Sequence, residues 1–383
     1  MSDSGVKIEV HLIQNFAPSN LNRDDTGQPK SAYFGGYRRA RVSSQCSKRS
    51  IRQMWQDTGV RTKLLKSELL PLLALEGRNE EQVSQALNTF ITQFYSKMDG
   101  EKTAVLLFVS REEITVVARL VNQHWDSLVA GNELKGADKN TCATALEQAK
   151  RSADIALFGR MLAEQPGRNT DGACQVAHPI STHKVDMEMD FYTAVDDLAP
   201  EEETGAGMMG VVGFNSACYY RYAVVDRDLL ARNLCGKTKR ANGGYVDALE
   251  DEEYQAADRA IKAFLNAMVY AIPTGKQHSF AAQNLPAFGL FVRRAGGVPV
   301  SLANAFAKPV RPSNRDDDSA RDLIGLSVEA LVKHWAEINQ VYGSLGTVST
   351  ACFHLGQAER LNGLDGADKG SVATAIDAVV KGV

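Results

Sequence analysis

The sequence predicts an α+β protein in which a sheet is layered with helices, and three observations support this class. Apolar and polar residues alternate over 6–12, which indicates a half-buried first strand. Two strand-like stretches flank an acidic, glycine-rich segment within 173–227, which predicts a long β-hairpin. Segments with helical spacing lie between and after these strands. A ferredoxin-like core is one arrangement that fits this order of elements.

Composition places the chain among ordinary globular proteins. Its 383 residues are 44% hydrophobic and 23% charged. The first residues lack a basic region followed by an apolar run, so no signal peptide is predicted. No segment reaches the roughly 18 consecutive apolar residues that a membrane span needs. The six cysteines are scattered without a CxxC pair and are predicted to be reduced thiols, which favours the cytoplasm.

The most unusual feature is a basic stretch at 21–55. It holds eight Lys and Arg residues against two Asp, a net charge of +6 in a chain whose overall charge is −3. Such a concentration of positive charge in an acidic protein indicates a polyanion site. On charge alone, a solvated surface without a partner is an equal alternative.

A helix is predicted at 44–57, with Ser43 or Ser44 as its cap. Four polar or basic residues at i, i+3, i+4 and i+7 share one face. These are Gln45, Lys48, Arg49 and Arg52. Their charges add to the partial positive charge of the helix N-terminus, so this face predicts an anion site, such as one for phosphate.

The remaining chain predicts a helical insertion, a sheet and a peripheral tail. Residues 60–167 are mainly helical, and no linker separates them as an independent domain. Helical spacing continues from 137 to Gly159 or beyond. Further helices are predicted at 252–271 and 326–343, with a strand at 286–294. The small, polar end of the chain is predicted to be peripheral.

Three motif-like patterns are not interpreted as sites. GAGMMG (205–210) lacks a strand before it and a helix after it, which a dinucleotide site needs. ARNLCGKT (231–238) follows a helical segment, whereas a P-loop follows a strand. Cys174, His178 and His183 lack the fourth ligand of a structural zinc site. No nucleophile motif is evident, so no catalytic residue, metal or cofactor is predicted from these patterns.

Several motifs along the chain resemble one family. They are LNRDD, FGGYRRARVSSQ and SKR within 21–50, DIALFGRM (154–161), AHPISTHKVDMEMDFYTAVDDL (177–198), FNSACYYRYA (214–223), IPTGKQHSFAAQN (272–284) and PVSLANAFAKPV (299–310). Together they resemble the CasC family, the backbone subunits of the type I-E CRISPR surveillance complex Cascade. The resemblance spans about 1–310 in order, and is weak over 60–140 and after 320.

This resemblance implies a three-part fold. An RNA-recognition-like (ferredoxin-like) palm would comprise 1–59 and 211–383. A helical fingers insertion would comprise 60–167, and a β-hairpin thumb 173–215. Family members polymerise head to tail along a guide RNA (crRNA) and let its bases pair with target DNA in antiviral defence. The implied partners are crRNA, target DNA, further copies of the chain, other Cascade subunits and a recruited nuclease-helicase. The family implies no membrane, no cofactor and no catalysis by the subunit itself.

The resemblance also assigns residues to roles. Lys30, Ser43, Gln45, Lys48 and Arg52 match positions that contact the guide, and Arg49 joins them because it shares their helix face. Met161 matches an apolar residue beside a displaced base, a role in which an apolar wedge replaces stacking. Phe191, Tyr192, Thr193 and Met209 match the thumb, with Phe191 where other members carry tryptophan. Arg23 and Asp25 match a subunit contact, while the roles of Arg38, Arg39 and Arg41 stay open.

Two alternatives remain at this point. Asp24 or Asp25 could hold a divalent metal in a related backbone subunit that cleaves target RNA. Their simpler interpretation is as ion-pair partners for Arg23 or for a neighbouring chain. A free-standing RNA-binding protein is the second alternative.

Overall fold

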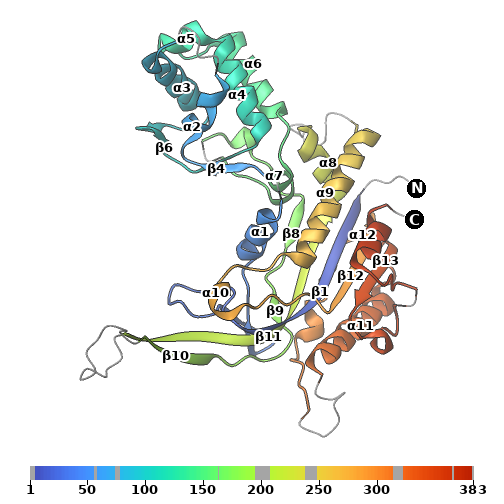
Figure 1. The fold of residues 1–383 in the computed structure, drawn as a ribbon. Helices are drawn as coiled ribbons and strands as arrows, with labels where there is room; N and C mark the ends of the chain where they lie inside the picture. Colours follow the sequence, from blue (N-terminus) through green and yellow to red (C-terminus); the bar gives the residue numbers. More distant parts are fainter. Residues whose placement is uncertain are drawn as a thin grey trace, which may run out of the picture. The chain divides into compact units, whose positions relative to one another are not determined.

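The computed structural model describes residues 5–55, 58–73, 78–162, 164–194, 208–237, 248–313, 322–364 and 366–381. The chain divides into two compact units (Figure 1). The first comprises Met1–Met54, Val176–Val224 and Lys262–Val383, and the second Trp55–Gln175 and Val225–Ile261. Both contain helices and strands, so the predicted α+β class is confirmed. The division into palm, fingers and thumb stays a prediction.

The first unit is built on a sheet of order β10-β11-β1-β12-β13, with β8 and β9 also paired to β11. Its strands are β1 (Val6–Ser19), β8 (Cys174–Val176), β9 (Ile180–Ser181), β10 (Glu188–Ala194), β11 (Met208–Asp226), β12 (Phe288–Ala295) and β13 (Thr347–His354). β12 is antiparallel to both β1 and β13. The first predicted strand is therefore confirmed, and it extends beyond the predicted residue 12 to Ser19, with Ile13 still paired to Phe288 of β12.

Helices cover both faces of this sheet. On β12, Phe288, Leu290 and Val292 point to one face, where they join the core beneath α11 (Leu323–Tyr342). On the other face, Arg293 donates to the carbonyls of Val379 and Val380 at 3.2 and 3.0 Å, at the end of α12 (Val372–Val380). The α9 helix (Asp251–Tyr270) lies beside α12, because Lys262 pairs with Asp377 at 2.6 Å.

The prediction that the end of the chain is peripheral was wrong. Helix α12 buries Ala375, Ile376, Val379 and Val380 against β12 and β13. These apolar residues recur at helical spacing and form a buried stripe on α12. The prediction relied on the average polarity of the whole end segment, which does not reveal such a stripe.

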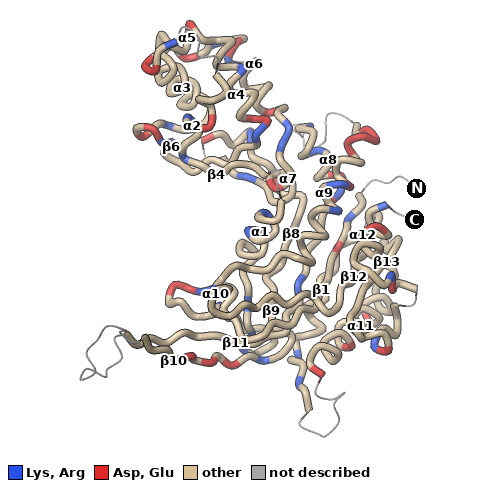
Figure 2. Tube along the Cα trace, viewed as in Figure 1, with Lys and Arg blue, Asp and Glu red and all other residues tan. Residues whose placement is uncertain are grey.

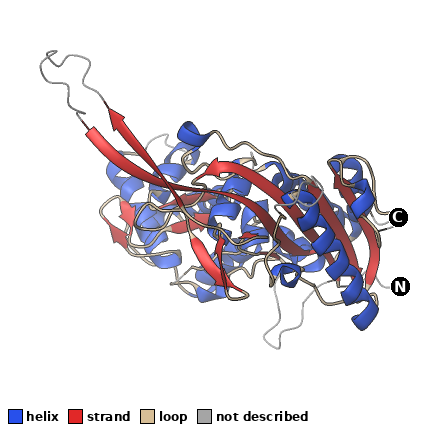
Figure 3. Ribbon diagram, turned by 90° about the horizontal axis from the view of Figure 1, so that it is seen from below, coloured by secondary structure: helices blue, strands red, loops and turns tan. Residues whose placement is uncertain are grey.

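The predicted β-hairpin is present. β10 pairs antiparallel with the first half of β11, and the register places Phe191 opposite Val211 and Thr193 opposite Met209. Figure 3 shows this pair of strands extending beyond the rest of the first unit's sheet. Residues 195–207, which carry the predicted acidic tip, lie outside the described residues.

The second unit is mainly helical. Its elements are β4 (Val60–Thr62), α2 (Leu65–Leu69), η1 (Leu70–Leu72), α3 (Glu80–Phe94), β5 (Met98–Asp99), β6 (Lys102–Thr103), β7 (Leu107–Val109), α4 (Arg111–Gln123), α5 (Trp125–Val129), α6 (Gly136–Gln148), α7 (Ala153–Phe158), η2 (Pro166–Arg168) and α8 (Arg227–Cys235). Leu87, Phe90, Val117 and Val121 lie at its core. The predicted helix from 137 is interrupted, because Ala149 leaves the helical conformation with ψ 130°. Among the described helices, none is long and apolar enough to cross a membrane.

Candidate nucleic-acid interface

The basic stretch of the first unit folds into a short hairpin and a helix. β2 (Ser31–Phe34) pairs with β3 (Tyr37–Ala40), and α1 spans Ser44–Gln53. The tight turn needs Gly35, which has φ +60° and approaches Ala307 so closely that an added Cβ would lie 1.8 Å from its carbonyl oxygen. This contact fixes the hairpin against the loop after η3 (Ala303–Phe306).

Ser43 caps α1, as predicted. Its Oγ accepts a hydrogen bond from the Cys46 backbone N–H at 3.2 Å, and its own N–H donates to Asn22 Oδ1 at 2.8 Å. The first turn contains no acidic side chain. No carboxylate of the first turn therefore neutralises the partial positive charge of the helix N-terminus.

The predicted polar face of α1 is confirmed in outline. Gln45 and Arg49 are exposed, Lys48 and Arg52 are half-buried, and Ile51 packs inward. Figure 2 shows basic positions along α1. The helix ends at Gln53 and not at the predicted residue 57, and Met54 lies exposed at its C-cap.

The loop before the hairpin is organised by Asp24. Its carboxylate accepts from Thr26 Oγ1 at 2.7 Å, the Thr26 N–H at 2.9 Å and the Gln28 N–H at 3.0 Å. The hydrogen bond from the Thr26 hydroxyl, followed by the backbone bonds and the charge of Lys30, lowers the pKa of Asp24 despite slight desolvation. Arg23 and Asp25 are exposed in the same loop. Within the described part of the chain, no group of three or more His, Cys, Asp or Glu side chains could hold a metal ion.

Lys30 links this loop to the rest of the basic surface. Its N–H donates to Asn22 O at 2.8 Å, and its carbonyl accepts from the Arg41 N–H at 2.9 Å. Arg41 Nη1 hydrogen-bonds His178 Nδ1 at 2.8 Å. Burial, and then the charges of Arg41 and Lys30, lower the pKa of His178, so the imidazole is neutral at pH 7 and accepts from Arg41.

The three arginines with open roles separate by environment. Arg39 is fully buried and donates to the carbonyls of Ser181 at 2.9 Å and Phe306 at 2.6 Å. It is a structural residue that joins β3 to two distant segments. Arg38 is exposed beside Ser31, and Arg41 is half-buried against His178. At least one of the positive charges counted in the basic stretch, that of Arg39, is therefore not available at the surface.

The loop around α10 (Gln277–Phe280) also contributes to this region, although composition and spacing did not predict a role for it. Gly275 packs against Leu21, and an added Cβ there would lie 2.3 Å from the Leu21 carbonyl oxygen. Lys276 and Ala281 both adopt positive φ, which is strained for residues other than glycine. Phe280 contacts Phe214 at the base of the hairpin, with ring centroids 5.8 Å apart. The only sequence signal was the quoted motif at 272–284.

The hairpin presents an apolar face. Phe191, Thr193, Val211 and Met209 share one side by register, and Phe191 and Met209 are 62% and 66% exposed. Tyr192 points to the other side, where its ring covers Gly210. The predicted thumb residues are thus close together, but Tyr192 does not share a face with Phe191.

All of the predicted site residues except Met161 lie in the first unit. Met161 belongs to the second unit, where its side chain is 78% exposed. Its immediate neighbours Arg160 and Leu162 are buried, so an apolar side chain is held at the surface between two anchored residues.

Comparisons with known proteins agree over nearly the whole chain. The model of the family described as CT1975-like protein matches residues 8–381. A chain of a structure described as "CRISPR RNA-guided surveillance complex, pre-nicking" is similar with a TM-score of 0.80 and 29% identity, covering 98% of this chain and 99% of that one. A chain of a "CRISPR RNA-guided surveillance complex" has a TM-score of 0.70 and 24% identity, covering 98% and 100%, and supports the fold alone. No curated protein matches significantly. The resemblance to Cascade-type CRISPR subunits is confirmed.

Proposed function

The chain belongs to the CT1975-like protein family, and on that premise we propose that it is a guide-RNA-binding subunit of a CRISPR surveillance complex. Similarity over nearly the full length of a chain from such a complex supports this role. In its finer form, the proposal is a non-catalytic backbone subunit of a type I-E Cascade. Copies polymerise along crRNA, present its bases to target DNA, and join other Cascade subunits and a recruited nuclease-helicase.

The observation that carries the proposal is the capped, acid-free start of α1 with basic residues on one face. A backbone subunit must hold guides of any sequence, so its contacts should go to phosphates rather than to base edges. Lys48 and Arg52 on the helix, with Lys30 on the adjoining segment, offer cations, and Gln45 adds an exposed amide. Such groups bind a phosphate backbone without reading its sequence.

The hairpin supports a second part of the same role. Its exposed apolar face, with Phe191 and Met209 on one side, can pack against a base that has left the stack. An RNA-recognition-like palm would supply the sheet behind it. Arg23 and Asp25 are exposed in the loop beside α1, which suits a contact with the next copy. Such head-to-tail contacts generate filaments rather than closed rings.

The first test asks whether RNA co-purifies with the protein and whether removing two basic side chains of α1 weakens RNA binding. The full-length protein, purified with its natural partners, should carry a short RNA of defined length. Lys48→Ala with Arg52→Ala should weaken RNA binding on the order of 100-fold and reduce the slope of log affinity against log salt by about 1.4. The loss should be equal for RNAs of different sequence. Lys333→Ala with Lys369→Ala, on α11 and just before α12, serves as the matched control and should change neither value.

A sequence-selective loss of affinity in the first variant would contradict the phosphate role. The cleavage alternative predicts magnesium-dependent RNA fragments at fixed spacing that Asp24→Ala or Asp25→Ala abolishes. The use of the Asp24 carboxylate by Thr26 and Gln28 supports the scaffold role instead.

A further inference from the structure

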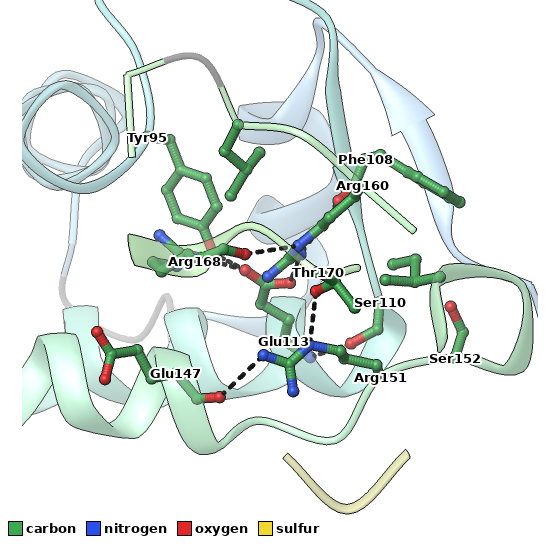
Figure 4. A network of polar contacts seen from close by, with 12 residues as sticks. Tyr95, Phe108, Ser110, Glu113, Glu147, Arg151, Ser152, Arg160, Arg168 and Thr170 are labelled. Atoms are coloured by element: carbon green, nitrogen blue, oxygen red, sulfur yellow. Dashed lines mark hydrogen bonds and ion pairs between the residues drawn. The ribbon is translucent and has the colours of Figure 1, made fainter. Parts of the chain in front are cut away.

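The second unit contains a buried polar cluster (Figure 4), and one of its members is Arg160, the residue before the exposed Met161. Its centre is Glu113 on α4, whose side chain is 2% exposed. Glu113 Oε2 accepts from Arg160 Nη1 at 2.5 Å. Its Oε1 accepts from the Tyr95 hydroxyl at 2.9 Å and from Arg168 Nη2. A buried carboxylate persists only when it is paired and hydrogen-bonded, and this one has partners on both oxygens.

The two arginines connect the carboxylate to separate parts of the chain. Arg160 Nη1 also donates to the carbonyl of Phe108 in β7 at 3.1 Å. Arg168 Nη1 donates to the carbonyl of Phe94 at the end of α3 at 2.7 Å, and its guanidinium lies 4.3 Å from the centre of the Tyr95 ring. The charges of Arg160 and Arg168 outweigh burial and lower the pKa of Glu113, so the carboxylate is ionised at neutral pH.

Hydrogen bonds on both sides of Met161 connect its neighbours to residues 169 and 170. Arg160 and Thr170 exchange backbone hydrogen bonds of 3.0 Å each. The Leu162 N–H donates to Asn169 Oδ1 at 2.7 Å, and Arg151 Nε donates to Thr170 Oγ1 at 2.9 Å. Met161 therefore lies between two residues that are hydrogen-bonded to 169–170, and one of them, Arg160, is bonded to Glu113.

We propose that Glu113 is a positioning residue for Met161, because it anchors Arg160 and Arg168 and so fixes Met161 in one conformation toward the guide RNA. The proposal rests on the proposed function, in which Met161 packs against bases. The contact itself is expected from the family; the dependence of that contact on a buried carboxylate in another helix comes from the hydrogen bonds around Glu113.

The test uses the full-length protein assembled on a single-stranded RNA long enough for several copies, with dimethyl sulfate to report base exposure. Met161→Ala should raise the reactivity of bases at regular intervals by about fivefold, the loss expected for one stacking contact. Glu113→Gln should give the same pattern, and the double variant should be no stronger than either single variant. Asp258→Asn breaks the Arg227–Asp258 ion pair elsewhere in this unit and should leave the pattern unchanged.

Tyr95→Phe is the milder second variant, in case Glu113→Gln does not fold. It removes the hydroxyl that donates to Glu113 Oε1, keeps the ring beside Arg168, and should give a weaker change at the same bases. A wild-type pattern in Tyr95→Phe or Glu113→Gln, or additive effects in the double variant, would overturn the proposal.

The two proposals fail in different ways. If Met161→Ala leaves base reactivity unchanged while neutralising Lys48 and Arg52 still abolishes binding, positioning is overturned and RNA binding stands. If the wild-type protein does not bind RNA, the proposed function itself is overturned before any variant is compared.

Discussion

Arginine occupies two contrasting environments, on α1 of the first unit and around Glu113 in the second. On α1, Arg49 is exposed on a helix whose first turn has no carboxylate. Around Glu113, Arg160 and Arg168 are buried against one shared carboxylate and several carbonyls. The first environment leaves positive charge at the surface for a phosphate, whereas the second uses it to hold the fold together. The partner of an arginine, more than its presence, determines its role.

The largest expected effect comes from removing the carboxylate from the buried cluster. Glu113→Ala leaves two buried arginines without their counter-charge, so the second unit should lose about 3–5 kcal/mol of stability. Hydrogen exchange of the amides of α4 measures this loss locally. Unchanged exchange in α4 would mean that the cluster is not a stabilising centre.

A smaller effect should separate two arginines of the basic stretch. Arg39→Ala leaves the buried carbonyls of Ser181 and Phe306 without their hydrogen-bond donor and should cost roughly 2–3 kcal/mol of stability. Arg49→Ala removes an exposed side chain and should leave stability within about 0.5 kcal/mol, while it weakens RNA binding. Thermal unfolding and RNA titration of both variants measure the contrast. Equal stability of the two would contradict the structural role of Arg39.

This contrast shows what sequence could predict. Local patterns found α1 with its Ser43 cap and the paired strands of the hairpin, because capping and alternation depend on neighbouring residues. The burial of Arg39 could not be predicted, because the carbonyls that accept its hydrogen bonds lie 142 and 267 residues away in the sequence. The Glu113 cluster could not be predicted for the same reason. Its members lie on separate elements, and nothing in their local sequence marks them as partners.

Acid should act on the buried cluster through Glu113. Its pKa lies below the ordinary value of 4.5, so its stabilising contribution is complete above pH 4.5 and is lost as the pH falls through the lowered pKa. The difference in unfolding free energy between the wild type and Glu113→Gln should therefore shrink from pH 6 to pH 3. Comparing the two proteins cancels other carboxyls, such as Glu9 and Asp24. A difference that stays constant with pH would show that Glu113 does not titrate with unfolding.

The smallest expected effect separates the cap of α1 from its proposed phosphate. Ser43→Ala removes the oxygen that accepts from Cys46 and should cost about 1 kcal/mol of stability. Ser43→Asp keeps an equally good cap, so stability should stay close to that of the wild type. The added negative charge at the helix start should nevertheless weaken RNA binding about threefold to fivefold, because it repels a phosphate there. Thermal unfolding and RNA titration at low salt measure the two effects.

Ser110 provides the matched control, because its Oγ caps α4 by accepting from the Glu113 N–H at 3.0 Å. Ser110→Ala should destabilise the second unit by at least a similar amount, since it loses the same kind of cap and also the hydrogen bond that Ser110 Oγ donates to the Lys150 carbonyl at 2.8 Å. It should leave the salt dependence of RNA binding unchanged, because that dependence reports on phosphate neutralisation by cations such as those on α1. If Ser43→Asp bound RNA as tightly as the wild type, the phosphate would have to lie away from the start of α1, on Lys30 or the helix side chains instead.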